Sequence, residues 1–101
     1  MITTDSRYIL RLFVAGDELN SRLARQNLEE ICHTYLQQQS YEIKVFDILE
    51  DIQVAFDNGI IITPMLIASF GQIEVKIMGN LNDTDKVLTA LNLNKKEHAD
   101  D

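Results

Sequence analysis

The only proline of the chain stands inside its most apolar segment, which runs from Ile60 to Ile67. Proline has no N–H to donate, so Pro64 can open a strand but cannot lie in the middle of a sheet. The apolar residues after it are typical of a strand that is covered on both faces. The segment therefore predicts a buried strand that begins at Thr63-Pro64.

Three other segments alternate between apolar and polar residues, as strands do. They are Arg7–Val14, Tyr41–Phe46 and Ile73–Met78. In the first, one face would carry Tyr8, Leu10, Leu12 and Val14, and the other Ile9 and Phe13. Phe70-Gly71-Gln72-Ile73 predicts a two-residue hairpin turn, because glycine readily adopts the positive φ that such turns need.

Three further segments have the helical period. The first runs from about Leu19 to Leu36, with an apolar stripe of Ala24, Leu28, Ile31, Cys32 and Tyr35. The second, Asp47–Asn58, would turn inward Ile48, Leu49, Ile52, Ala55 and Phe56. The third follows Asn82, a predicted N-cap, and would bury Val87, Leu88 and Leu91.

The resulting order is βαβαββα, which predicts an α/β domain with a mixed four-stranded sheet and helices on both faces. This order resembles the thioredoxin-like fold, in which Thr63-Pro64 would occupy the place of a structural cis-proline. We expect one domain over residues 1–94, followed by a charged, flexible tail over 95–101.

The composition disfavours several classes of partner. Sixteen acidic residues against nine basic ones give a formal charge of −7, which opposes binding to nucleic acid. No apolar run is long enough to span a membrane, and the first residues do not resemble a secretory signal. One cysteine cannot form an internal disulfide and fits a reducing compartment. We therefore expect a cytoplasmic protein whose partner is another protein.

The chain also lacks the usual reagents of catalysis. No Cys-x-x-Cys motif follows the first strand, and Cys32 lies in an apolar stripe, where burial would make its thiol inert. His33 points away from Cys32, as neighbouring helical residues do. The carboxylates near the second helix are better explained as caps and solvated groups. We predict no catalytic residue, no cofactor and no metal ligand.

Several segments together resemble the KaiB family. They are Phe13-Val14-Ala15-Gly16, Asn20-Ser21-Arg22, the strand from Tyr41 to Asp47, Ile62-Thr63-Pro64-Met65-Leu66, Gly79-Asn80-Leu81 and Lys86-Val87-Leu88. The resemblance extends from about Tyr8 to Leu93 and needs almost no change in length.

This resemblance implies a non-enzymatic adaptor that binds a KaiC-type ATPase and modulates it. It further implies possible association with a KaiA-like protein or a histidine kinase, and a dimer or tetramer in one state. By the same resemblance, Tyr8, Arg22 and Lys44 are the candidates for partner contact. An equally open interpretation is that Tyr8 packs in the core and that Arg22 and Lys44 are ordinary solvated cations of the surface.

KaiB proteins are known in two folds, a thioredoxin-like monomer and a rearranged ground state. Gly71 stands where the family has a proline run, and Ala90-Leu91-Asn92 replaces its Gly-Leu-Asp. Alanine favours a helix over glycine by about 1 kcal/mol. Pro64, Gly71, Ala90 and Asn92 are thus our candidate determinants of the fold state, and we expect the thioredoxin-like one, with fold switching weak or lost.

Two alternatives remain open on the sequence. A thioredoxin- or glutaredoxin-like redox or stress protein would need an accessible Cys32. A KaiB-like sensor module of a histidine kinase would have the same fold and cannot be told apart by pattern. A role in circadian timing is a weaker inference than binding to the ATPase.

Overall fold

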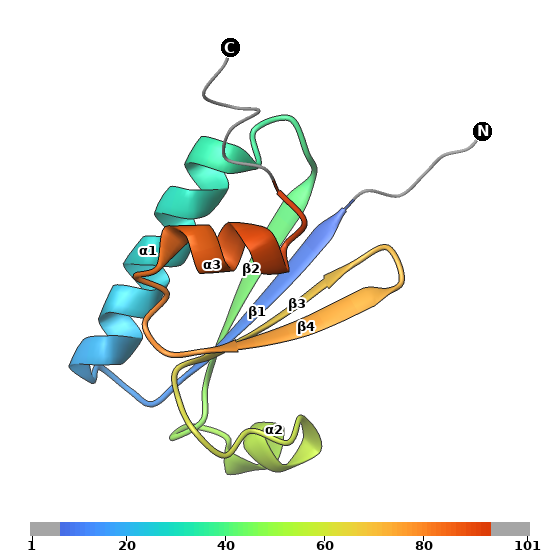
Figure 1. The fold of residues 1–101 in the computed structure, drawn as a ribbon. Coiled ribbons are helices and arrows are strands. Elements are labelled where there is room, and N and C mark those ends of the chain that lie inside the picture. The colour runs from blue at the N-terminus through green and yellow to red at the C-terminus, as the bar shows by residue number, and fades with distance from the viewer. Residues whose placement is uncertain (1–6, 94–101) are drawn as a thin grey trace.

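The computed structural model describes residues 7–93, so the tail predicted for 95–101 lies outside the described residues. Seven elements follow one another along the chain (Figure 1). They are β1 (Tyr8–Val14), α1 (Leu19–Tyr35), β2 (Tyr41–Asp47), α2 (Ile52–Asp57), β3 (Met65–Phe70), β4 (Ile73–Met78) and α3 (Thr84–Ala90). The predicted order of strands and helices is confirmed.

The four strands form one sheet in the order β2-β1-β3-β4. β1 and β2 are parallel, because α1 carries the chain back between them, whereas β3 runs antiparallel to both β1 and β4. Helices α1 and α3 lie together against the sheet, and α2 lies apart from them at one end (Figure 1). This is the thioredoxin-like arrangement. A strand hairpin follows Pro64, so this structure has the predicted fold and not the rearranged one.

The core has two parts, one on each face of the sheet. The larger lies beneath α1 and α3 and includes Leu10 and Leu12 of β1, Leu28 of α1 and Leu88 of α3. The smaller lies beneath α2 and consists of Phe13, Ala55, Ile60, Met65 and Ile67. Alternation along β1 distributes its side chains between the two parts, as the sequence predicted.

Helix α2 is shorter than predicted. It begins at Ile52, after the N-cap Asp51, and not at Asp47. The Asp47 Oδ1 instead accepts from the Leu49 N–H at 3.0 Å and from the Gly16 N–H at 2.9 Å, which holds residues 47–50 in a turn. The helical period of this segment therefore extends further in the sequence than in the structure.

The inward face predicted for residues 48–56 was correct only in part. Ala55 is buried and Ile48 packs against the smaller core. Leu49, Ile52 and Phe56, which were also expected to point inward, are exposed. Leu49 lies in the turn before α2, and Ile52 and Phe56 share a side of the helix that is exposed, whereas Ala55 lies on the side that enters the core.

Local backbone features shape the turn and the helix cap of the C-terminal half. Gly71 has φ 60 at the first of the two hairpin positions, where glycine fits best. The N-cap of α3 is Asp83, which accepts from the Lys86 N–H, and not the predicted Asn82. The Thr63-Pro64 bond is cis.

Helix α3 ends at Ala90 with Leu91 as its C-cap, and the next residue, Asn92, has φ 60. The Leu93 N–H donates to the Leu88 carbonyl, and the Asn92 N–H donates to the Thr89 carbonyl. This pair of bonds is a Schellman motif, which satisfies carbonyls that the end of a helix leaves without partners.

Candidate partner-binding surfaces

Tyr8, the first residue suggested for partner contact, is buried in the larger core. Its ring stacks on Phe70 with centroids 4.9 Å apart, and its hydroxyl donates to the Leu91 carbonyl at 3.0 Å. Burial raises the pKa of this phenol above its usual value of 10.0. In this fold, Tyr8 links β1 to the C-terminal end of α3 and offers little surface to a partner.

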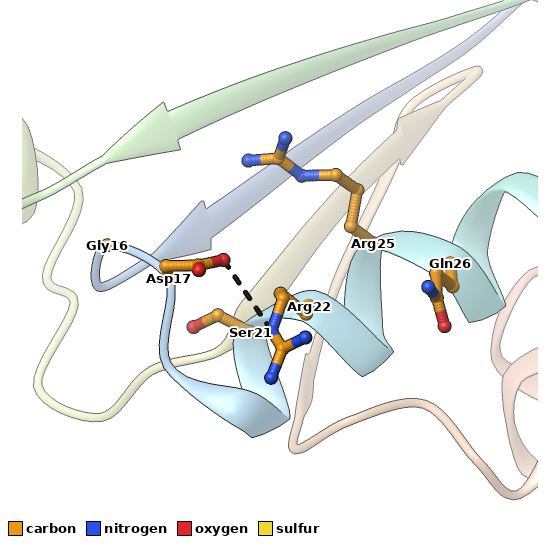
Figure 2. Close-up of a pocket in the computed structure, with 6 residues that line it drawn as sticks. All are labelled: Gly16, Asp17, Ser21, Arg22, Arg25 and Gln26. Atoms are coloured by element: carbon orange, nitrogen blue, oxygen red, sulfur yellow. Dashed lines mark ion pairs between the residues drawn. The ribbon is translucent and has the colours of Figure 1, made fainter.

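Arg22, the second candidate, lines a small pocket beside the first turn of α1. The pocket has a volume of about 240 Å³ and is lined by Gly16, Asp17, Ser21, Arg22, Arg25 and Gln26. Figure 2 shows Asp17 and Arg22 facing one another, and Arg22 Nε lies 3.5 Å from Asp17 Oδ1. Both side chains are exposed, so this ion pair leaves Arg22 available to a partner.

Lys44, the third candidate, lies on the edge strand β2 and is half exposed. Its position opposite Arg11 places it on the sheet face that α2 partly covers, whereas Tyr8 faces α1 and α3. Its ammonium lies 3.9 Å from Glu42, too far for a strong bond. The three predicted contact residues thus occupy separate places and do not form one site.

The structure instead exposes a set of large apolar side chains around α2. We define the apolar surface as Leu49, Ile52, Phe56, Ile61, Ile62 and Met78. Phe56 is 73% exposed, Leu49 72% and Ile61 91%. Ile52 and Phe56 share one side of α2 at a spacing of four residues, and the others come from the turn before it, the loop after it and the end of β4. Large apolar side chains exposed around one short helix indicate an interaction site.

Sequence reasoning missed this surface because the helical period of residues 48–56 was interpreted as a buried face. One signal was present. Ile60, Ile61 and Ile62 are consecutive, and three adjacent side chains before a strand cannot all point into one core. Of these three, only Ile60 is buried.

The fixed position of Asp47 also shapes this region. By accepting from both Gly16 and Leu49, its carboxylate joins the β1–α1 loop to the turn before α2. The two segments then pack closely, since a Cβ added to Gly16 would lie 3.1 Å from Leu49 Cδ1. Leu49 is held at the rim of the apolar surface in this way.

The thiol of Cys32 is fully buried, as predicted, and has no route to a substrate. Burial, with a smaller contribution from Glu29, raises its pKa from 9.0 to about 12. Such a thiol stays protonated at neutral pH and is a poor nucleophile. Residues 7–93 contain no group of three or more His, Cys, Asp or Glu side chains placed to hold a metal ion.

Within the same described region, none of the helices has the length and apolar character needed to cross a bilayer.

Comparisons with known proteins indicate which family the chain is similar to. The family model described as "KaiB domain" matches residues 11–93. The "Circadian clock oscillator protein KaiB" of Trichodesmium erythraeum is 38% identical over 94 residues, which cover 93% of this chain and 89% of the relative. "Circadian clock protein KaiB3" of Synechocystis is 34% identical over 88 residues, covering 87% and 85%.

Solved structures agree on the fold. The N-terminal domain of Synechococcus elongatus SasA superposes with a TM-score of 0.73 at 17% identity, covering 91% of this chain and 90% of that one. The thioredoxin of Fasciola hepatica gives a TM-score of 0.66 at 19% identity, with 89% and 84% covered. At such identities these two show a shared thioredoxin-like fold only. With the family model covering most of the described residues, the chain belongs to the KaiB family.

Proposed function

We propose that this chain is a non-enzymatic adaptor of the cytoplasm that binds a KaiC-type ATPase and modulates its activity or signalling. The apolar surface around α2 is the observation that carries the proposal. Six large side chains from four segments are presented to solvent there, and they include the three most exposed large apolar side chains of the described residues, Ile61, Phe56 and Leu49. Membership of a family whose curated relatives are named as circadian clock proteins gives the surface a class of partner.

An adaptor explains the chemistry of this chain better than an enzyme does. The one thiol is buried with a pKa of about 12, which argues against the redox alternative. The pocket beside α1 is lined by Arg22 and Arg25, and its one hydroxyl, that of Ser21, is buried and bonded to the N-cap carboxylate of Glu18, as a helix cap requires. Arg22 and Lys44 stay accessible and would contribute at other contacts, with a KaiA-like protein or a histidine kinase among the partners.

The same fold is expected to be the resting state. The Schellman motif at Asn92, the hairpin glycine Gly71 and the bond from Tyr8 to Leu91 all favour the strand hairpin followed by α3. Pro64 and Ala90 fit the same state, one at the entry to β3 and one in the last turn of α3. These contacts support our proposal that switching to the rearranged fold is weak in this chain.

The test is co-elution with the KaiC-type ATPase of the same cell on size-exclusion chromatography, with the ATPase loaded with ADP. The proposal predicts a complex that contains this chain. If the two proteins elute separately at concentrations well above micromolar, the chain is not an adaptor of that ATPase. A thiol reagent that reacts with Cys32 in the native protein would favour the redox alternative instead.

A further inference from the structure

Strand β4 is an edge of the sheet, where it pairs with β3 alone. An edge strand has one row of backbone N–H and C=O groups without ladder partners, and such a row can pair with a second chain. In an antiparallel pair, residues bonded to the partner alternate with residues that are not. The Gly79 N–H donates to the Pro64 carbonyl at 3.0 Å, so the odd-numbered residues of β4 bond to β3. Glu74, Lys76 and Met78 therefore direct their backbone groups outward.

The side chains of β4 differ between its two faces. Val75 and Ile77 pack with the larger core, and alternation places Ile73 on the same face, where it is 44% exposed. Glu74 and Lys76 lie on the opposite face, and both are exposed. They are the two charged residues of the strand, they have opposite signs, and they stand two positions apart.

We propose that β4 pairs with β4 of a second copy of this chain, in an antiparallel dimer whose two-fold axis passes beside Val75. Two-fold symmetry then places Glu74 of each copy opposite Lys76 of the other, and Ile73 opposite Ile77. Residues directly opposite point to the same face, so each carboxylate meets an ammonium. The same Glu74–Lys76 pairs exchange the outward N–H···O bonds, because these are the residues with free backbone groups.

Charge selects this register over its neighbours. A register that brings odd-numbered residues opposite even-numbered ones would set free backbone groups against groups already bonded to β3. The next registers that keep the hydrogen bonds would place Glu74 opposite Glu74, or Lys76 opposite Lys76, at the two-fold axis. Like charges directly opposite destabilise a strand pair. The sequence of β4 is therefore complementary to itself in one register.

Both charged groups are available for this pairing. Glu74 Oε2 lies 3.4 Å from Arg11 Nη2, and the Glu74 side chain is 57% exposed, so this contact is weak. Lys76 forms no ion pair within residues 7–93. Its ammonium lies near Gly59, where an added Cβ would be 4.0 Å away. An exposed ammonium on a flexible stem can turn from there to the edge.

The other edge strand, β2, has the same spacing of charges, with Glu42 two positions before Lys44. Its charges are already engaged, however. Glu42 accepts from Arg7 at 3.3 Å and lies 3.9 Å from Lys44 of its own strand. Lys76 of β4 has no such carboxylate in the described part of the chain, so it gains more from a partner. Lys44 on β2 is therefore the matched control.

This dimer does not depend on the proposed docking of an ATPase. In an antiparallel pair, the Met78 residues of the two copies lie at opposite ends of the joined strands, so each copy keeps its apolar surface at its own end. The formal charge of −7 on each copy opposes association at a distance. We therefore expect the dimer at high concentration and moderate salt, where that repulsion is screened.

The test is analytical ultracentrifugation of the whole chain at rising concentration, which should show a monomer that converts to a dimer. Lys76→Glu should weaken dimerisation by about tenfold or more, because both symmetric pairs become pairs of like charge. Lys44→Glu makes the same change of charge on β2 and should leave dimerisation unchanged. Glu74→Lys should also weaken the dimer. An equal mixture of the Lys76→Glu and Glu74→Lys chains should dimerise, because opposite charges then meet again.

Amide hydrogen exchange locates the contact. The outward N–H groups of Glu74 and Lys76 should exchange more slowly as the concentration of the unchanged chain rises. Any of four results would overturn the proposal. They are a monomer up to about 1 mM, which is the limit of weak specific association, equal effects of Lys44→Glu and Lys76→Glu, a mixture of the two β4 variants that stays monomeric, and assemblies that grow beyond a dimer. The last would indicate pairing of β4 with β2 of the next copy.

Discussion

The side chains of Tyr8 and Cys32 are buried, and each carries one polar group whose contribution to stability can be tested. Tyr8 carries the hydroxyl that joins the first strand to the last helix, and it donates to the Leu91 carbonyl at 3.0 Å. Cys32 carries a thiol that is shielded by α1 and the sheet. Each can be tested by a change of very few atoms.

Tyr8→Phe keeps the ring stacked on Phe70 but leaves the Leu91 carbonyl without this donor. We expect the free energy of unfolding to fall by about 1–2 kcal/mol, as for other buried hydrogen bonds that lose one partner. Urea denaturation followed by circular dichroism measures it. Tyr41→Phe is the matched control, because Tyr41 is 39% exposed and should tolerate the change. Equal losses in the two variants would contradict a special role for the Tyr8 hydroxyl.

Cys32 should make stability depend on alkaline pH. Its pKa is raised in the folded state to about 12, from 9.0. Well below the unfolded pKa both states hold the proton, so the thiol has no pH effect there. Above it only the unfolded state releases the proton readily, so stability falls as pH rises toward the folded pKa. Across the onset of this alkaline range, urea midpoints should decline less steeply in Cys32→Ala than in the unchanged chain, and identical slopes would refute this.

At the scale of elements, the short helices depend on their caps and not on their length. Helix α3 has seven residues, and its stop is completed by a left-handed Asn92 just after the C-cap Leu91. Asparagine tolerates this conformation, glycine prefers it and β-branched residues are strained in it. The sequence change that replaces the family's Gly-Leu-Asp thus acts at the helix stop as well as in the last turn.

Asn92→Val should destabilise the chain by about 1–2 kcal/mol because of this strain, whereas Asn92→Gly should have a small effect or none. Thermal unfolding of the two variants beside the unchanged chain measures the difference. Since the side chain of Asn92 is exposed, loss of packing cannot account for it. Equal melting temperatures for the two variants would show that the backbone at Asn92 relaxes freely.

The elements show which parts of the fold the sequence can predict. The strands, α1 and the hairpin at Gly71 were predictable because alternation, helical period and a turn glycine each have one local cause. The N-cap of α3 was misplaced by one residue, because Asn82 and Asp83 are both good caps and only tertiary geometry selects Asp83. The start of α2 could not be predicted, because the Asp47 bond to Gly16 crosses between loops that are far apart in sequence.

The same limit applied to the candidate surfaces. Arg22 and Lys44 were available from the resemblance, but their separation depends on the fold. The apolar surface was not predicted, because exposed and buried apolar residues give the same pattern in a sequence.

At the scale of the whole molecule, the two faces of the sheet have different tasks. Helices α1 and α3 cover one face and bury the larger part of the core. The short α2 lies at one end of the sheet (Figure 1), and the apolar surface around it is exposed. A stable framework with one incompletely covered face fits an adaptor.

The most direct test is calorimetric titration of the ADP-loaded KaiC-type ATPase with the unchanged chain, with Phe56→Ser and with Ile73→Ser. Phe56 lies in the apolar surface, whereas Ile73 is an exposed apolar residue at the hairpin, at the opposite end of β4 from Met78. Loss of a large aromatic anchor should weaken binding by about tenfold or more, which corresponds to roughly 1.4 kcal/mol, and Ile73→Ser should bind as the unchanged chain does. Full affinity in Phe56→Ser would contradict the assignment of the apolar surface as the docking site.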